Sequence, residues 1–89
     1  MTPEQSRAAR GWLGWSQAEL ARRANVSVGT VKSFESGQKT PLPNNLSALR
    51  RAVEGEGLRL LFDEQGQAAG LAHSDTEGEV KRLRRRPRG

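Results

Sequence analysis

The stretch from Ser27 to Ser36 holds the side chains best suited to chemistry in this 89-residue sequence, and that chemistry is hydrogen bonding. Four hydroxyl groups surround one ammonium group, in the order Ser27, Thr30, Lys32, Ser33 and Ser36. Gly29 stands among them, although glycine inside a helix costs about 1 kcal/mol relative to alanine. We expect the missing side chain to let a ligand approach the backbone, and DNA suits such a polar surface.

The residue types that catalysis or metal binding requires are missing or scattered. The sequence has no cysteine, its carboxylates are dispersed, and it contains neither a recognisable nucleophile and base pair nor a glycine-rich phosphate loop. His73, the only histidine, follows the last predicted strand and has no metal-binding or catalytic partner in the pattern. The sequence therefore predicts that the protein is not an enzyme and needs no cofactor or metal.

Two short helices are expected to position the polar stretch. Ser16 and Ser27 are typical N-caps, so they predict helices over 17–24 and 27–36, with Glu19 completing a capping box at the first. Asn25 lies between the helices, where the chain must turn sharply, and asparagine tolerates the left-handed conformation. Helices this short are marginal alone, so they must pack against others.

The remaining elements follow from caps, prolines and periodicity. Thr2 and Pro3 predict the start of a first helix, which ends near Leu13 before Gly14, with Trp15 in the core and Trp12 partly exposed. A stripe of Leu42, Leu46, Leu49 and Val53 predicts a helix over 43–54. Alternation of Leu58, Leu60 and Phe62 predicts a strand with one buried face, and 68–72 returns as a second strand.

The expected fold is mostly α, with four or five helices followed by a short β-hairpin. We divide it into a helical domain at 1–56, a hairpin at 57–73 and a disordered basic tail at 74–89. The net charge is +5, and residues 73–89 carry six Lys or Arg against three Asp or Glu. A basic chain without a membrane span or signal peptide predicts a soluble cytoplasmic protein that meets nucleic acid.

The spacing resembles the phage repressor and Cro-like family, the XRE-type helix-turn-helix proteins, over roughly residues 4–54. The matching positions are Arg10, Gly14, Ser16, Gln17, Glu19, Leu20, Ala21, Val26, Ser27, Thr30, Val31, Phe34, Glu35, Gly37 and Pro41. Asn25 departs from the glycine usual in the family, and Val28 and Gly29 replace polar base-reading residues. The resemblance implies a repressor-like domain whose helix 27–36 enters the major groove, but it does not supply the operator sequence.

The resemblance also implies roles for single residues. Gln17 would donate to a phosphate, Val28 would pack on a thymine methyl, and Lys32 would contact guanine. The other contacts, to phosphates or base edges, fall to Ser27, Gly29, Thr30, Ser33, Gln38 and Lys39. Simpler interpretations remain open, because Gln17 and Ser27 can serve only as caps or their neighbours, and Lys32 can be an ordinary solvated lysine. Arg10 and Glu35 match a buried structural ion pair of the family.

Such domains usually pair across a two-fold axis, so we expect a homodimer. The hairpin residues Leu58, Leu60, Leu61 and Phe62 are the predicted dimerisation element, although they can instead complete the core of one monomer. The basic tail can follow phosphates, keep the chain soluble or bind an acidic protein.

The leading hypothesis is a sequence-specific transcriptional regulator, a repressor or autoregulator of the phage, mobile-element or controller type, associated with the nucleoid. RNA polymerase or another protein is a further partner to consider. The alternative is an antitoxin or other interaction module whose hairpin and tail bind a protein partner.

Overall fold

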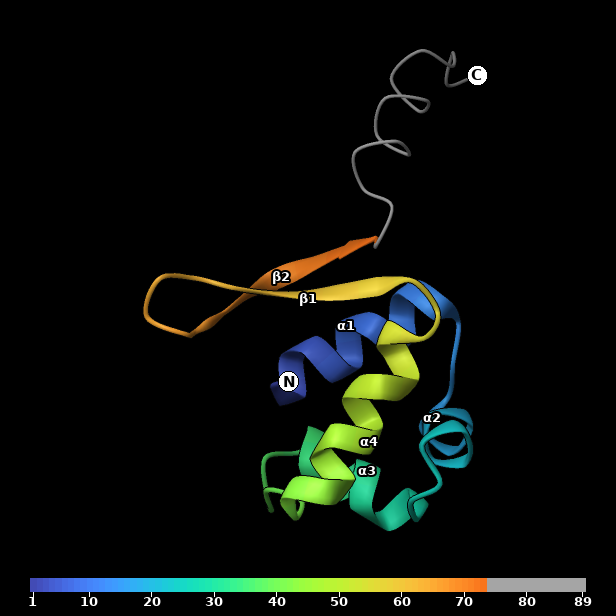
Figure 1. The fold of residues 1–89 in the computed structure, drawn as a ribbon. Coiled ribbons are helices and arrows are strands. Elements are labelled where there is room, and N and C mark those ends of the chain that lie inside the picture. Colours follow the sequence, from blue (N-terminus) through green and yellow to red (C-terminus); the bar gives the residue numbers. More distant parts are fainter. Residues whose placement is uncertain (74–89) are drawn as a thin grey trace, which may run out of the picture.

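Four helices and a two-stranded antiparallel hairpin make up the computed structural model, which describes residues 1–73 (Figure 1). The elements are α1 (Pro3–Leu13), α2 (Gln17–Ala24), α3 (Val28–Glu35), α4 (Pro43–Glu54), β1 (Leu58–Phe62) and β2 (Ala68–His73). The predicted mostly α fold with a terminal hairpin is confirmed, with four helices. The predicted disordered basic tail, 74–89, lies outside the described residues.

Local signals in the sequence determine where α1 begins and ends. The Thr2 hydroxyl accepts a hydrogen bond from the Gln5 amide at 3.1 Å, and the Gln5 side chain accepts one from the Thr2 amide at 3.1 Å. This reciprocal capping box makes Thr2 the N-cap, so the helix begins at Pro3. Gly14 ends it in the left-handed conformation, with φ 73°.

The start of α2 departs from the predicted capping box. The Ser16 hydroxyl accepts from the Glu19 amide at 3.0 Å, as an N-cap should. The Glu19 carboxylate, however, accepts hydrogen bonds from Arg22 and Arg23, at 2.5 and 2.7 Å, instead of returning to the cap. Two guanidinium groups one turn along the helix are stronger partners for a carboxylate than one backbone amide. The predicted N-cap, Ser16, is therefore confirmed, and the predicted capping box with Glu19 is wrong.

The core lies where α1, α2, α3 and α4 meet beneath the hairpin, and it is built from small and branched apolar side chains. Its buried members are Ala9, Leu20, Ala21, Ala24, Val31, Phe34, Leu49, Val53, Leu58 and Leu60. Leu42, expected on the apolar stripe of α4, is 73% exposed because it precedes Pro43 as the N-cap residue. Among residues 1–73, no helix is long and apolar enough to cross a membrane.

The hairpin completes this core with one end of β1. Leu58 and Leu60 are buried, and Leu60 pairs with Leu71 of β2. The pairing register then shifts between Leu61 and Phe62, because Ala69 of β2 is left without a partner on β1 in a bulge. Phe62 is 39% exposed, with the guanidinium of Arg50 on α4 lying 5.7 Å from its ring centre, so its predicted burial with Leu58 and Leu60 was wrong.

Candidate nucleic-acid interface

A three-residue turn sets the angle between α2 and α3. Asn25 adopts the left-handed conformation, with φ 59°, and its amide donates to the Arg22 carbonyl at 3.2 Å. The next amide, of Val26, donates to the Ala21 carbonyl at 3.0 Å, so both residues close the end of α2. Ser27 then begins α3 as its N-cap, and its hydroxyl accepts from the Thr30 amide at 3.1 Å.

α3 has one face in the core and one face open. Val31, Phe34 and Glu35 are buried with at most 4% exposure, which fixes the helix against its neighbours. The opposite face presents Val28, 39% exposed, together with the exposed Lys32. Most of the residues that the sequence predicted for DNA contact therefore lie together on or beside the open face of one helix.

Gly29 lies in the first turn of this open face. A β-carbon built at this position meets only the Ser27 hydroxyl oxygen, at 3.8 Å, among residues 1–73. That is an ordinary contact, so the packing of the described chain leaves room for alanine. The fold of the monomer therefore does not explain why glycine, which lowers the stability of a helix, stands at this position.

The turn after α3 holds two further predicted residues. The amides of Gln38 and Lys39 both donate to the Ser33 carbonyl, at 2.9 and 3.2 Å. Gly37, with φ 80°, allows the chain to fold back in this way. Backbone bonds thus hold the exposed side chains of Gln38 and Lys39 beside the C-terminal end of α3.

A shallow groove of about 510 Å³ runs between α3 and the segment that leads into α4. Ser27, Gly29, Thr30, Ser33 and Lys39 line it, as do Thr40, Pro41, Leu42 and Asn45. The last four were not among the predicted site residues. The available signal was Leu42 before Pro43. Leucine has no side-chain acceptor, so no side-chain cap hydrogen bond satisfies the amides in the first turn of α4.

The last residue of α3 ties it to two other helices. The Glu35 carboxylate is buried and accepts from Arg10 Nη2 at 2.7 Å and Nε at 2.9 Å, and from the Ser6 hydroxyl at 2.5 Å. The Arg7 guanidinium donates to the backbone carbonyl of Glu35. Burial raises the pKa of Glu35, but the hydrogen bonds from Arg10, Ser6 and Gln17 outweigh it and leave the pKa below its ordinary value.

Gln17 belongs to this same network. Its side-chain amide donates to the Glu35 carboxylate at 3.1 Å, a partner that its sequence position did not reveal. One amide hydrogen of Gln17 is thereby used, and the second is available to a ligand.

The two arginines of α2 are held by their own neighbours. The Arg23 guanidinium lies 4.4 Å from the Trp15 ring centre and, with Arg22, bonds Glu19. These bonds lower the pKa of Glu19 to about 2. Arg23 also pairs with Glu56 at 3.3 Å, so carboxylates of the same chain bind both arginines.

Comparison with protein families places this interface within a known kind of domain. A family model described as helix-turn-helix, HTH_3, aligns with residues 7–54, which is more than half of the chain. No curated protein is significantly similar to the chain. The matched range contains α2, α3 and the turn between them, together with the groove described above.

Proposed function

Because the chain belongs to the XRE-type helix-turn-helix family, whose domains bind DNA, we propose that it is a sequence-specific transcriptional regulator that places α3 in the major groove. The observation that carries this proposal is the open polar face of α3, whose opposite face is fixed by the core and by Glu35. A rigid helix with exposed donors is what direct reading of base edges requires.

The first turns of α3 would read the bases. Lys32, exposed near the middle of the helix, is our candidate for the acceptor atoms of guanine, and Val28 offers an apolar surface to a thymine methyl. Gly29 lets the backbone come close between them. Ser27 already caps the helix, so we assign it a positioning role first.

The groove beside α3 would hold the DNA backbone. Lys39 lines it, Gln38 precedes Lys39 in the chain, and Asn45 in the first turn of α4, which has no side-chain cap, lines it as well. Backbone amides at a helix start attract phosphate, and lysine adds charge. The remaining amide hydrogen of Gln17 serves a further phosphate, which places a phosphate contact on either side of the recognition helix.

Two copies of one short helix would give tight and specific binding. We therefore propose a dimer that reads half-sites about 34 Å apart and represses by covering its operator, inside the cell and on its own gene. In the predicted hairpin interface, Leu58 and Leu60 are already used by the monomer core, which leaves Leu61 and Phe62 for a partner. RNA polymerase contact remains a prediction.

Selection of bound duplexes from a random DNA library tests the proposal. We expect a two-fold-symmetric product from the purified chain. Lys32→Ala should then lose about 1–3 kcal/mol of binding at particular base pairs only, while the control Arg59→Ala, on β1, should keep the preference.

Other results of this selection would contradict the proposal. Recovery of no preferred sequence would exclude the regulator and favour the protein-interaction module. An equal loss across all duplexes for Lys32→Ala would assign Lys32 to the DNA backbone instead of the bases.

A further inference from the structure

The first turn of α3 presents an apolar end to solvent. Val28, the first residue of the helix, is 39% exposed and lies outside the core cluster, so the fold makes little use of its isopropyl group. Gly29 follows it, and glycine has no side chain with which to form a hydrogen bond. Two neighbouring residues at the start of the recognition helix therefore offer no polar side chain to a base.

The hydroxyl groups of the same turn are bonded to one another. The Ser27 oxygen accepts the Thr30 amide at 3.1 Å and lies 2.9 Å from the Thr30 hydroxyl oxygen, so one of the two hydroxyl groups donates to the other. The hydroxyl group that keeps its hydrogen can still donate or accept. Such a group bonds the O4 acceptor of thymine and the N4 amino group of cytosine alike. The polar side chains of this turn therefore do not distinguish thymine from cytosine.

An apolar surface does distinguish these two bases, through a methyl group. Thymine carries a methyl group on C5 in the major groove, whereas cytosine carries only hydrogen there. 5-Methylcytosine has the same methyl group at the same place, on a base that pairs with guanine. A valine side chain that covers this methyl group removes apolar surface from water, which strengthens binding about fourfold for each methyl group buried.

We propose that Val28 reads the C5-methyl group itself, so that α3 accepts 5-methylcytosine in place of thymine and discriminates against unmethylated cytosine at one base pair of its DNA site. The inference rests on the proposed function, because it requires α3 to lie in the major groove. It extends that function to DNA that is modified at cytosine C5. Methylation of a cytosine at this base pair would then raise the affinity of the chain for the site.

Selection by the full chain from four random duplex pools tests the proposal. The pools combine thymine or uracil with cytosine or 5-methylcytosine, so that each pyrimidine is present with or without its methyl group. At one position of the selected sequence we expect thymine in the ordinary pool and 5-methylcytosine in the pool that contains uracil. The pool with both methylated bases should give either base there, and the pool with neither should give no preference.

Titration of single duplexes then measures the effect of the methyl group. The selected duplex with thymine or 5-methylcytosine at this position should bind about fourfold more tightly than the same duplex with uracil or cytosine, respectively. Val28→Ala should bring each pair of affinities within about twofold, because most of the apolar surface is removed. Alanine favours a helix more than valine does, so the melting temperature of this variant should not fall.

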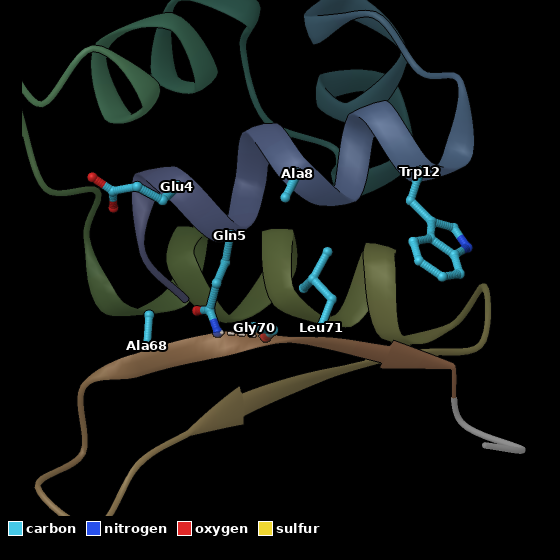
Figure 2. Close-up of a pocket in the computed structure, with 7 residues that line it drawn as sticks. All are labelled: Glu4, Gln5, Ala8, Trp12, Ala68, Gly70 and Leu71. Carbon is cyan, nitrogen blue, oxygen red and sulfur yellow. Dashed lines mark hydrogen bonds between the residues drawn. The ribbon is translucent and has the colours of Figure 1, made fainter. Parts of the chain in front are cut away.

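Two other exposed apolar side chains provide comparisons for Val28→Ala. Trp12 is 61% exposed and lines the groove between α1 and β2, outside the proposed DNA interface (Figure 2). Leu42 is 73% exposed and lines the groove beside α3. Trp12→Ala and Leu42→Ala should both keep the ratio of affinities between methylated and unmethylated duplexes.

Several outcomes would overturn the proposal. Equal binding of thymine and uracil duplexes would show that no methyl group is read. Refusal of 5-methylcytosine where thymine is accepted would show that the O4 atom of thymine is read by a hydrogen bond, for example from Lys32. Loss of the methyl preference in Leu42→Ala but not in Val28→Ala would move the contact to the loop before α4. Each of these results leaves a preferred sequence and the proposed function in place, whereas selection of no sequence from any pool would exclude both.

Discussion

Gly29 is the residue at which the needs of the fold and of DNA binding can be separated. A β-carbon fits there with only an ordinary contact to Ser27, so Gly29→Ala should raise the free energy of unfolding by up to about 1 kcal/mol. The same methyl group should weaken operator binding, because it holds the helix away from the duplex. Thermal melting and a binding titration on each protein measure the two effects.

Ser47→Ala is the matched control for this residue. It improves helix propensity on the exposed surface of α4, so it should stabilise the chain and leave operator affinity unchanged. If Gly29→Ala bound DNA as tightly as the original chain, the hypothesis that DNA closely approaches the backbone at Gly29 would be wrong.

The ionised Glu35 carboxylate makes the free energy of unfolding depend on pH. Its pKa is lowered in the folded chain, so the unfolded chain takes up this proton at a higher pH than the folded chain does. The contribution of the ionised Glu35 carboxylate to the free energy of unfolding is complete at neutral pH and is lost as the pH falls below about 4.5. We expect the melting temperature of the original chain to fall more steeply from about pH 5 to about pH 3 than that of Glu35→Gln.

An exposed carboxylate provides the comparison for this measurement. Glu64→Gln makes the same change at an exposed position of the hairpin turn, outside the hydrogen bonds that Glu35 accepts. Parallel curves for Glu35→Gln and the original chain would mean that the acid response arises elsewhere, for example from Glu19, whose pKa is about 2.

Among the elements, the start of α3 offers a test of capping against DNA contact. Ser27→Ala removes the acceptor of the Thr30 amide and should cost about 1 kcal/mol of stability, while Ser27→Asn keeps an acceptor and should cost little. If Ser27 acts only as a cap, operator affinity should follow stability in both variants. Loss of affinity in Ser27→Asn at full stability would reveal a direct contact with DNA.

The boundaries of the elements could be predicted because they depend on neighbours in sequence. Thr2, Ser16 and Ser27 bond amides three residues away, while Gly14 and Asn25 supply left-handed conformations where helices end. Such signals act over three or four residues, and a single sequence contains all of them.

Misassigned side chains depended on competition and on distant parts of the chain. The Glu19 carboxylate bonds two guanidinium groups instead of the amide of the cap residue, and Phe62 stays 39% exposed although it continues the alternation of Leu58 and Leu60. The side-chain amide of Gln17 donates to the carboxylate of Glu35, 18 positions away in the sequence. α3 could be recognised from its own residues. By contrast, Thr40, Leu42 and Asn45 line the groove because of how the loop and the start of α4 pack beside α3, which the sequence does not show.

On the scale of the whole molecule, charge is concentrated in the segment after the hairpin. Residues 80–89 contain six Lys or Arg and no Asp or Glu. Deleting them should weaken binding to all DNA sequences alike and reduce the dependence of affinity on salt, because fewer counterions are released. The preferred sequence should stay the same. Titrations of operator and unrelated DNA at several salt concentrations measure both quantities, and a changed base preference would contradict the expectation.

Gln5 joins the two ends of the described chain through one side chain. Its oxygen closes the capping box with Thr2, while its nitrogen donates to the carbonyls of Leu61 and Gly70, at 3.0 and 3.2 Å, one on each strand. Glutamate, the common partner in such boxes, has no donor for those carbonyls. The first turn of α1 and the hairpin should therefore open as a single cooperative unit, so that their amide hydrogens exchange with solvent at a common rate.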